Sequence, residues 1–113
     1  MSPRDWLFRI QDIVDALTHI ESYIRGMSYE QWLNDRKTVD AVIRNLEIIG
    51  EAAKHIPPET MNRYSDIPWG KMRAMRNVLI HEYFGVDVEI IWKTVTEDLP
   101  ILKRQLDEVA WGE

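Results

Sequence analysis

The chain has no cysteine among its 113 residues, which excludes disulfide frameworks, thiol nucleophiles and cysteine-based zinc or iron–sulfur sites. Glycine and proline are few, with five of each, so collagen-like and low-complexity chains are excluded too. No apolar run approaches the roughly 18 residues that a membrane-spanning helix needs, and the first residues lack the apolar core of a secretory signal. We therefore expect one soluble, cytoplasmic domain over residues 1–113, without a membrane contact.

Positive charge is also in short supply, since 14 Lys and Arg stand against 19 Asp and Glu and give a net charge of -5. This acidity argues against an indiscriminate nucleic-acid binder, because non-specific affinity comes mostly from Lys and Arg on phosphates. One stretch is an exception, where Arg63, Lys71, Arg73 and Arg76 follow one another with only Asp66 as a counter-charge. This locally basic stretch predicts either a contiguous positive site or an ordinary solvated helix face.

Apolar residues recur at intervals of three and four along most of the chain, which is the period of amphipathic helices. The first helix is expected to begin at Ser2-Pro3, where serine can cap and proline suits the first turn, and to end at Gly26. Ser28 and Gln31 have the spacing of a capping box, which predicts a second, short helix.

A third apolar stripe runs from Val39 to Ile56, and Pro57-Pro58 is expected to end its helix. Pro68 is placed to begin another helix and Gly85 to end it. The residues between these two helices lack a sustained period, so they read as a connection with at most one helical turn.

Asp87 is expected to cap the last helix, whose apolar residues keep helical spacing from Val88 to Val109. Pro100 lies inside this stripe, so we expect a kink rather than an end. No run of period two indicates a strand. The pattern predicts an all-α, up-and-down four-helix bundle with an additional short helix, in a single domain.

Few side chains are suited to chemistry, and they gather in the string from Arg76 to Tyr83. On a helix Arg76 and Tyr83 share nearly one face, and Asn77 and His81 share the adjoining one. Arginine offers planar donors to a phosphate, and histidine exchanges protons near neutral pH. Together they suit RNA phosphodiester cleavage without a metal or other cofactor, in which the 2′-hydroxyl needs a base and the leaving oxygen an acid.

One chain supplies only one well-placed histidine for a reaction that uses both an acid and a base. A two-fold dimer that brings together two copies of the string would supply two histidines and two arginines, so this mechanism predicts a homodimer. Structural roles are also open for each residue. Arg76 could pair a nearby acid, His81 could cap a helix end, and Tyr83 could pack its ring.

The motif Arg-x-x-x-x-His-x-Tyr at Arg76, His81 and Tyr83 resembles the signature of HepT-like toxins in the HEPN superfamily, the higher eukaryotes and prokaryotes nucleotide-binding domains. The similarity extends over residues 5–109. Beside the motif it rests on Val42-Ile43-Arg44-Asn45-Leu46-Glu47-Ile48-Ile49-Gly50-Glu51-Ala52, Ile67-Pro68-Trp69, Met75-Arg76-Asn77, Tyr83-Phe84-Gly85-Val86-Asp87 and Glu97-Asp98-Leu99-Pro100.

The resemblance implies a helical two-fold dimer with a composite cleft that holds Arg76 and His81 from each chain. It also implies a metal-independent endoribonuclease, the toxin of a toxin–antitoxin pair, acting on RNA. The partner implied is a minimal nucleotidyltransferase antitoxin that transfers AMP from ATP to Tyr83. Asn77 matches the polar residue after the motif arginine. Glu51 matches a recurrent acid that would orient Arg76 or pack at a helix crossing.

A second function class stays open, a non-catalytic HEPN module that binds a nucleotidyltransferase partner or a nucleotide. The intact motif favours the enzyme, whereas the net acidity favours the binding module. A helical dimer without chemistry is a third alternative.

Overall fold

The computed structural model describes residues 3–74 and 87–112, and within this part of the chain every regular element is helical. The all-α prediction is confirmed. The helix expected from Pro68 to Gly85 lies largely outside the described residues, so the count of four main helices stays a prediction. Among the described helices, none combines the length and the apolarity that crossing a membrane requires. The elements are α1 (Pro3–Ile24), α2 (Tyr29–Leu33), α3 (Arg36–Lys54), α4 (Pro58–Arg63), a helix over residues 69–74, α6 (Val88–Lys93), the π-helical turn η2 (Thr94–Asp98) and α7 (Leu99–Gly112).

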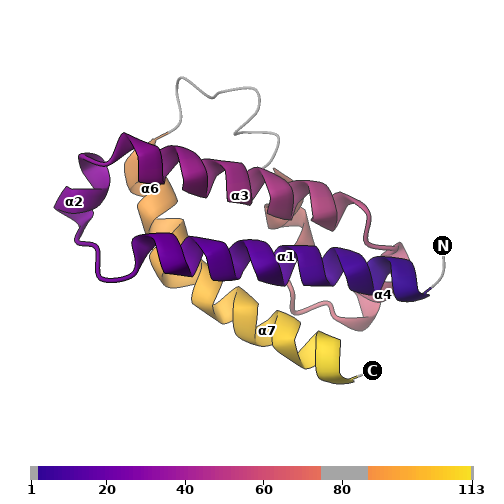
Figure 1. Cartoon of the computed structure of the whole chain (residues 1–113). Helices are drawn as coiled ribbons and strands as arrows, with labels where there is room; N and C mark the ends of the chain where they lie inside the picture. Colours follow the sequence, from indigo (N-terminus) through magenta and orange to yellow (C-terminus); the bar gives the residue numbers. More distant parts are fainter. Residues whose placement is uncertain (1–2, 75–86, 113) are drawn as a thin grey trace.

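The long helices α1 and α3 lie side by side, and α7 packs against α1 (Figure 1). The short helices α2 and α4 lie at opposite ends of this assembly. The stripes expected from the sequence face inward. The largest fully buried side chains come from α1, α2, α3 and α7, and they are Ile10, Ile13, Leu17, Ile20, Trp32, Val42, Leu46, Leu106 and Val109.

The connection from α1 to α3 follows the local rules that its sequence indicates. Gly26 has a φ of +74°, a backbone angle that residues with a Cβ rarely adopt, and α1 ends just before it. Ser28 and Gln31 form the expected capping box, with each side chain accepting the other's backbone N–H at 3.1 and 2.8 Å. These bonds satisfy backbone N–H groups at the start of the short α2.

Trp32 ties α2 to α6, which is far away in the sequence. Its side chain is fully buried, and its indole N–H donates to the carbonyl of Val88 at 3.0 Å. Its ring also lies against Trp92, with centroids 5.5 Å apart. The start of α6 is therefore held in place by a buried ring and a hydrogen bond.

The end of α3 differs from the expectation. The helix ends at Lys54, where His55 forms the C-cap and its N–H bonds back to Ala52, rather than at Pro57-Pro58. Pro58 instead begins α4, so the connection, for which one helical turn is expected, holds a helix of six residues that starts earlier than that turn. The reason is that proline lacks only an N–H that the first helical turn does not use, so it starts a helix as readily as it ends one.

The last helix continues through Pro100, as expected, and the structure shows how. Five residues before the proline form the π-turn η2, in which the N–H of Leu99 bonds to the carbonyl of Thr94. Proline has no N–H to donate and its ring would press on the carbonyl four residues back. The wider turn moves the preceding carbonyls away from that clash, and the buried stripe resumes at Leu99 and Leu102.

Asp35 caps α3 and gives a testable pH dependence. Its carboxylate accepts from the N–H and the hydroxyl of Thr38 at 3.0 and 2.7 Å. The backbone bond first, and the hydroxyl bond second, hold the pKa of Asp35 below its ordinary value of 3.8. Because the folded pKa is the lower one, the charged carboxylate stabilises the fold above the unfolded value, and this contribution is lost as pH falls through the folded value.

Asp35→Asn keeps an oxygen acceptor at the cap and removes the titration. We expect the difference in free energy of unfolding between wild type and Asp35→Asn to be constant above about pH 5 and to shrink below about pH 4. Urea unfolding between about pH 2.5 and 7 measures it. A difference that does not change over that range would contradict the assignment.

Candidate functional site

Four of the five site residues expected from the sequence lie outside the described residues. They are Arg76, Asn77, His81 and Tyr83, so their roles stay predictions. The structure does describe the fifth, Glu51, and it describes the elements to which the motif segment is attached on both sides.

On the N-terminal side the motif is attached to the helix over residues 69–74. Trp69 and Met72 are buried, and the indole N–H of Trp69 donates to the carbonyl of Tyr64 at 3.1 Å. Ala74 ends the described part of this helix, two residues before Arg76. Two residues span at most about 7 Å between Cα atoms, so the position of Ala74 limits where Arg76 can lie.

On the C-terminal side the motif is attached to the start of α6. Asp87 is the N-cap, and its carboxylate accepts the N–H of Glu89 at 2.9 Å. The next residue, Val88, is the one that Trp32 holds. Tyr83 precedes Asp87 by four residues and thus lies within about 14 Å of it.

Tyr29 contributes to the same junction between α2 and α6. Partial burial, followed by the carboxylates of Glu89 and Asp87, raises the pKa of its phenol above the ordinary value of 10. The Tyr29 hydroxyl therefore stays protonated at neutral pH, and its ring lies 6.2 Å from that of Trp92.

Glu51 lies near the C-terminal end of α3, on the side that faces α1. Its Oε1 is 3.4 Å from Nε2 of His55, one helical turn further on, and its Oε2 is inaccessible to solvent. Glu51 lines a groove of about 370 Å³ between the two helices. Three acids and two arginines border this groove, so it is not a simple site for a phosphate. Its lining residues are Arg9, Asp12, Arg44, Glu47, Ile48, Glu51 and Ala52.

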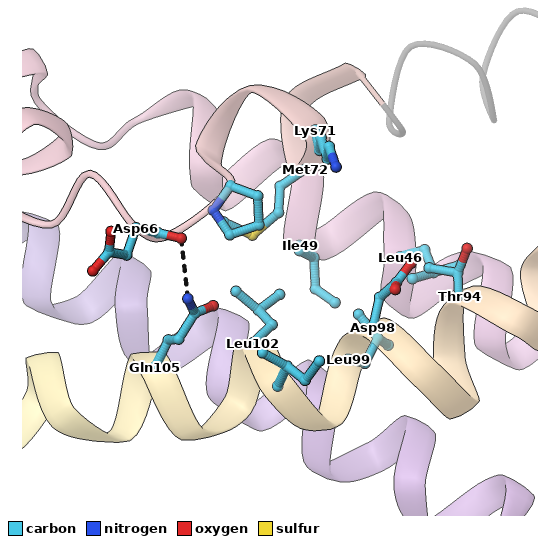
Figure 2. A pocket seen from close by; sticks show the side chains of 12 residues that line it. Leu46, Ile49, Asp66, Lys71, Met72, Thr94, Asp98, Leu99, Leu102 and Gln105 are labelled. Atoms are coloured by element: carbon cyan, nitrogen blue, oxygen red, sulfur yellow. Dashed lines mark hydrogen bonds between the residues drawn. The ribbon is translucent and has the colours of Figure 1, made fainter.

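A second cavity, of about 300 Å³, lies closer along the chain to the motif (Figure 2). Its walls are mainly apolar and come from α3, from the residues around Met72 and from α7. Gln105 closes one side, where its amide donates to the carbonyl of Asp66 at 3.0 Å. Lys71 and Asp98 add charged groups to its border.

Two cations next to the motif were not singled out by the sequence as site residues. Lys71 and Arg73 are exposed on the helix over residues 69–74. Neither forms an ion pair within residues 3–74 and 87–112, and Arg73 only brings Nη1 to 4.0 Å from Sδ of Met61. The available signal was the local excess of positive charge, which by itself did not separate a site from a solvated face.

The chain is helical in the residues that the structure describes, and its sequence has an Arg-x-x-x-x-His-x-Tyr string between two of these helices. Residues 13–109 match the family described as ribonuclease HepT-like, and this range includes the motif and most of the helices described above. The chain is a member of that family.

Individual relatives agree with the family match. The chain is 48% identical over 108 residues to a probable ribonuclease HepT of Thermococcus cleftensis, covering 96% of each chain. It is 38% identical over 112 residues to a protein of Caldanaerobacter subterraneus subsp. tengcongensis named as a putative RNase, covering 99% of this chain and 97% of the relative. A protein of Methanocaldococcus jannaschii with the same description is 38% identical over 109 residues, covering 96% and 90%. No solved structure gives a significant match.

Proposed function

We propose that the protein is a metal-independent endoribonuclease of the cytoplasm, with a composite active site formed by two copies of the chain. The observation that carries the proposal is the family match over residues 13–109, a range in which the sequence has Arg76, His81 and Tyr83 at the spacing of the motif. The anchored helix before the motif and the anchored start of α6 after it support the proposal, because catalytic groups need rigid elements on which to be positioned.

The proposed chemistry uses only groups of the protein and of RNA. One His81 accepts the proton of the RNA 2′-hydroxyl, whose oxygen attacks the adjacent phosphorus. Arg76 stabilises the negative charge that grows on the phosphate oxygens. The His81 of the second copy protonates the leaving 5′-oxygen, so the products are a 2′,3′-cyclic phosphate and a 5′-hydroxyl. Asn77 and Glu51 support the site by holding the substrate or Arg76.

Cleavage of RNA by the purified protein in excess EDTA tests this function. We expect cleavage to persist, and the 3′ ends to carry a 2′,3′-cyclic phosphate that acid opens to a monophosphate. Cleavage that stops with EDTA and returns with Mg²⁺ would instead indicate a metal-activated nucleophile.

The composite site makes a prediction about assembly. Because one chain supplies one motif histidine, the active species should be a homodimer with its two-fold axis near the motif. Light scattering of the active protein should give twice the chain mass of 13.4 kDa. A strict monomer that cleaves RNA at micromolar concentration would rule out the shared site.

We further propose that the protein is the toxin of a toxin–antitoxin pair, controlled by a nucleotidyltransferase that adds AMP to Tyr83. A tyrosine hydroxyl is a poor nucleophile near its ordinary pKa, so the partner has to supply the base and the Mg²⁺ that polarises ATP. Each adduct places negative charge where RNA phosphates must bind. The family match and the intact Tyr83 support this part of the proposal.

Tyr83→Phe tests the control mechanism, because it removes only the acceptor oxygen. Co-expression of the wild type with a neighbouring nucleotidyltransferase should add one or more units of about 329 Da, the mass of an AMP residue, and restore growth. The Tyr83→Phe protein should remain toxic. Full neutralisation of Tyr83→Phe, with no adduct on the wild type in intact-mass spectra, would show that simple complex formation controls the toxin.

A non-catalytic module that binds a nucleotidyltransferase or a nucleotide is the second candidate. The net charge of -5 favours it over an enzyme that must hold RNA. Expressing the wild type and His81→Ala alone separates the two, because only an active enzyme slows growth and degrades RNA in a manner that depends on His81.

A further inference from the structure

Lys71 and Arg73 form a basic surface whose charge the described residues do not compensate. Both side chains are exposed, and neither has an ion-pair partner within residues 3–74 and 87–112. Two other exposed cations of the described residues do have such partners. Arg36 pairs with Asp40 at 2.9 Å, and Arg44 approaches Glu47 at 3.5 Å.

These two cations are also the described charges nearest in sequence to the motif arginine. Arg73 precedes Arg76 by three residues, so their Cα atoms lie within about 11 Å whatever the conformation between them. The helix that carries Lys71 and Arg73 is fixed by the buried side chains of Trp69 and Met72. Its charges are thus held at a set place, at a short distance from the proposed catalytic arginine.

The basic surface lies in a locally positive part of an otherwise acidic chain. Residues 54–74 carry four Lys and Arg against two Asp and Glu, a net charge of +2, so the remaining chain carries -5 - 2 = -7. A polyanion is repelled by most of such a molecule and attracted by this part. Single-stranded RNA presents a phosphate at every nucleotide, so a strand with one phosphate at Arg76 extends others to within reach of neighbouring cations.

We propose that Lys71 and Arg73 bind phosphates of the RNA strand beside the scissile one, and so set the position of the substrate on the enzyme. This inference rests on the proposed ribonuclease function and adds two substrate-binding residues to it. Arg73 suits this role particularly, because its planar guanidinium can donate two hydrogen bonds to one phosphate, whereas Lys71 acts as a point charge.

The test compares two double variants with equal charge. Lys71→Gln with Arg73→Gln removes the surface, and Arg25→Gln with Lys37→Gln removes two exposed cations that flank α2 in the sequence. Each pair changes the net charge from -5 to -7, so general electrostatics are matched. All proteins also carry His81→Ala, which allows the binding of a labelled single-stranded RNA to be measured by anisotropy without cleavage.

We expect Lys71→Gln with Arg73→Gln to weaken RNA binding about tenfold at low salt, while the control pair changes it less than about twofold. The slope of log K against log salt should become shallower by about 1.4, because two phosphate contacts are lost from a single strand. Lys71→Arg with Arg73→Lys keeps both charges and should keep most of the affinity. Circular dichroism confirms that each variant is folded.

Equal affinity and equal slope for the two double variants would overturn the assignment. That result would instead indicate that Lys71 and Arg73 bind an acidic protein partner. Loss of binding in the charge-keeping variant as well would overturn it too, since the effect would then not depend on charge. A different result would contradict the proposed ribonuclease function, namely that the protein with an intact His81 does not cleave RNA in EDTA.

Discussion

His81→Ala is expected to lower kcat for RNA cleavage by about 10²- to 10⁴-fold, the range that general acid–base catalysis contributes. The same substitution removes the base from one half of the composite site and the acid from the other. Stopped assays on a labelled RNA, with single-turnover kinetics, measure the loss. His81 does not belong to the apolar stripes of the sequence, so helical content should be unchanged.

His19→Ala is the matched control, because His19 is an exposed histidine of α1 whose ring stacks on Tyr23 at 6.3 Å. It should leave kcat and KM unchanged. Arg76→Ala should resemble His81→Ala, and Arg76→Lys should recover part of the activity, because lysine keeps the charge but loses the planar donors. An active His81→Ala protein, or an equal loss in His19→Ala, would remove the proposed role of the motif histidine.

Trp32→Ala is expected to destabilise the fold by about 3–5 kcal/mol, the usual cost of truncating a large buried aromatic side chain. Its indole is fully buried and holds both Val88 and Trp92, so the substitution leaves a cavity and detaches the start of α6. Since domains of this size are stable by about 5–15 kcal/mol, the variant should unfold at much lower urea concentration. RNA cleavage should fall as well, because α6 follows the motif directly.

Trp32→Phe separates packing from the hydrogen bond in this position. It keeps an aromatic ring in the core and loses the N–H that donates to Val88, so a smaller loss of about 1–2 kcal/mol is expected. Urea unfolding followed by circular dichroism compares the three proteins. A Trp32→Ala protein as stable as Trp32→Phe would show that the indole does not hold α2 to α6.

The sequence predicts the helices well where a local rule acts alone. The capping box at Ser28, the stop at Gly26 and the cap at Asp87 appear where the residue types place them, because each satisfies backbone groups within one turn. The effect of the prolines is harder to predict from the sequence. Pro58 starts a helix, and Pro100 lies behind a π-turn, since proline excludes one hydrogen bond but does not say how the neighbouring residues will rearrange.

In the candidate site, too, some features can be predicted from the sequence and others cannot. Chemical types in a fixed pattern single out Arg76, His81 and Tyr83, whose positions fall within the range of the family match, and their roles stay predictions. The surroundings depend on contacts between residues far apart in sequence, such as Trp32 with Val88 or Arg73 with Met61. No periodicity in the sequence encodes these pairings, so the groove beside Glu51 emerges only from the structure. The same holds for the absence of an ion pair at Lys71 and Arg73 within residues 3–74 and 87–112.

The contact of Trp32 with Trp92 also gives the molecule an intrinsic optical probe. Two indoles with centroids 5.5 Å apart and planes inclined by 37° couple their electronic transitions, and the coupling changes steeply with distance and angle. The near-ultraviolet circular dichroism should therefore contain a contribution from the junction between α2 and α6. This signal follows the start of α6, next to the motif, separately from the total helical content, without any added label.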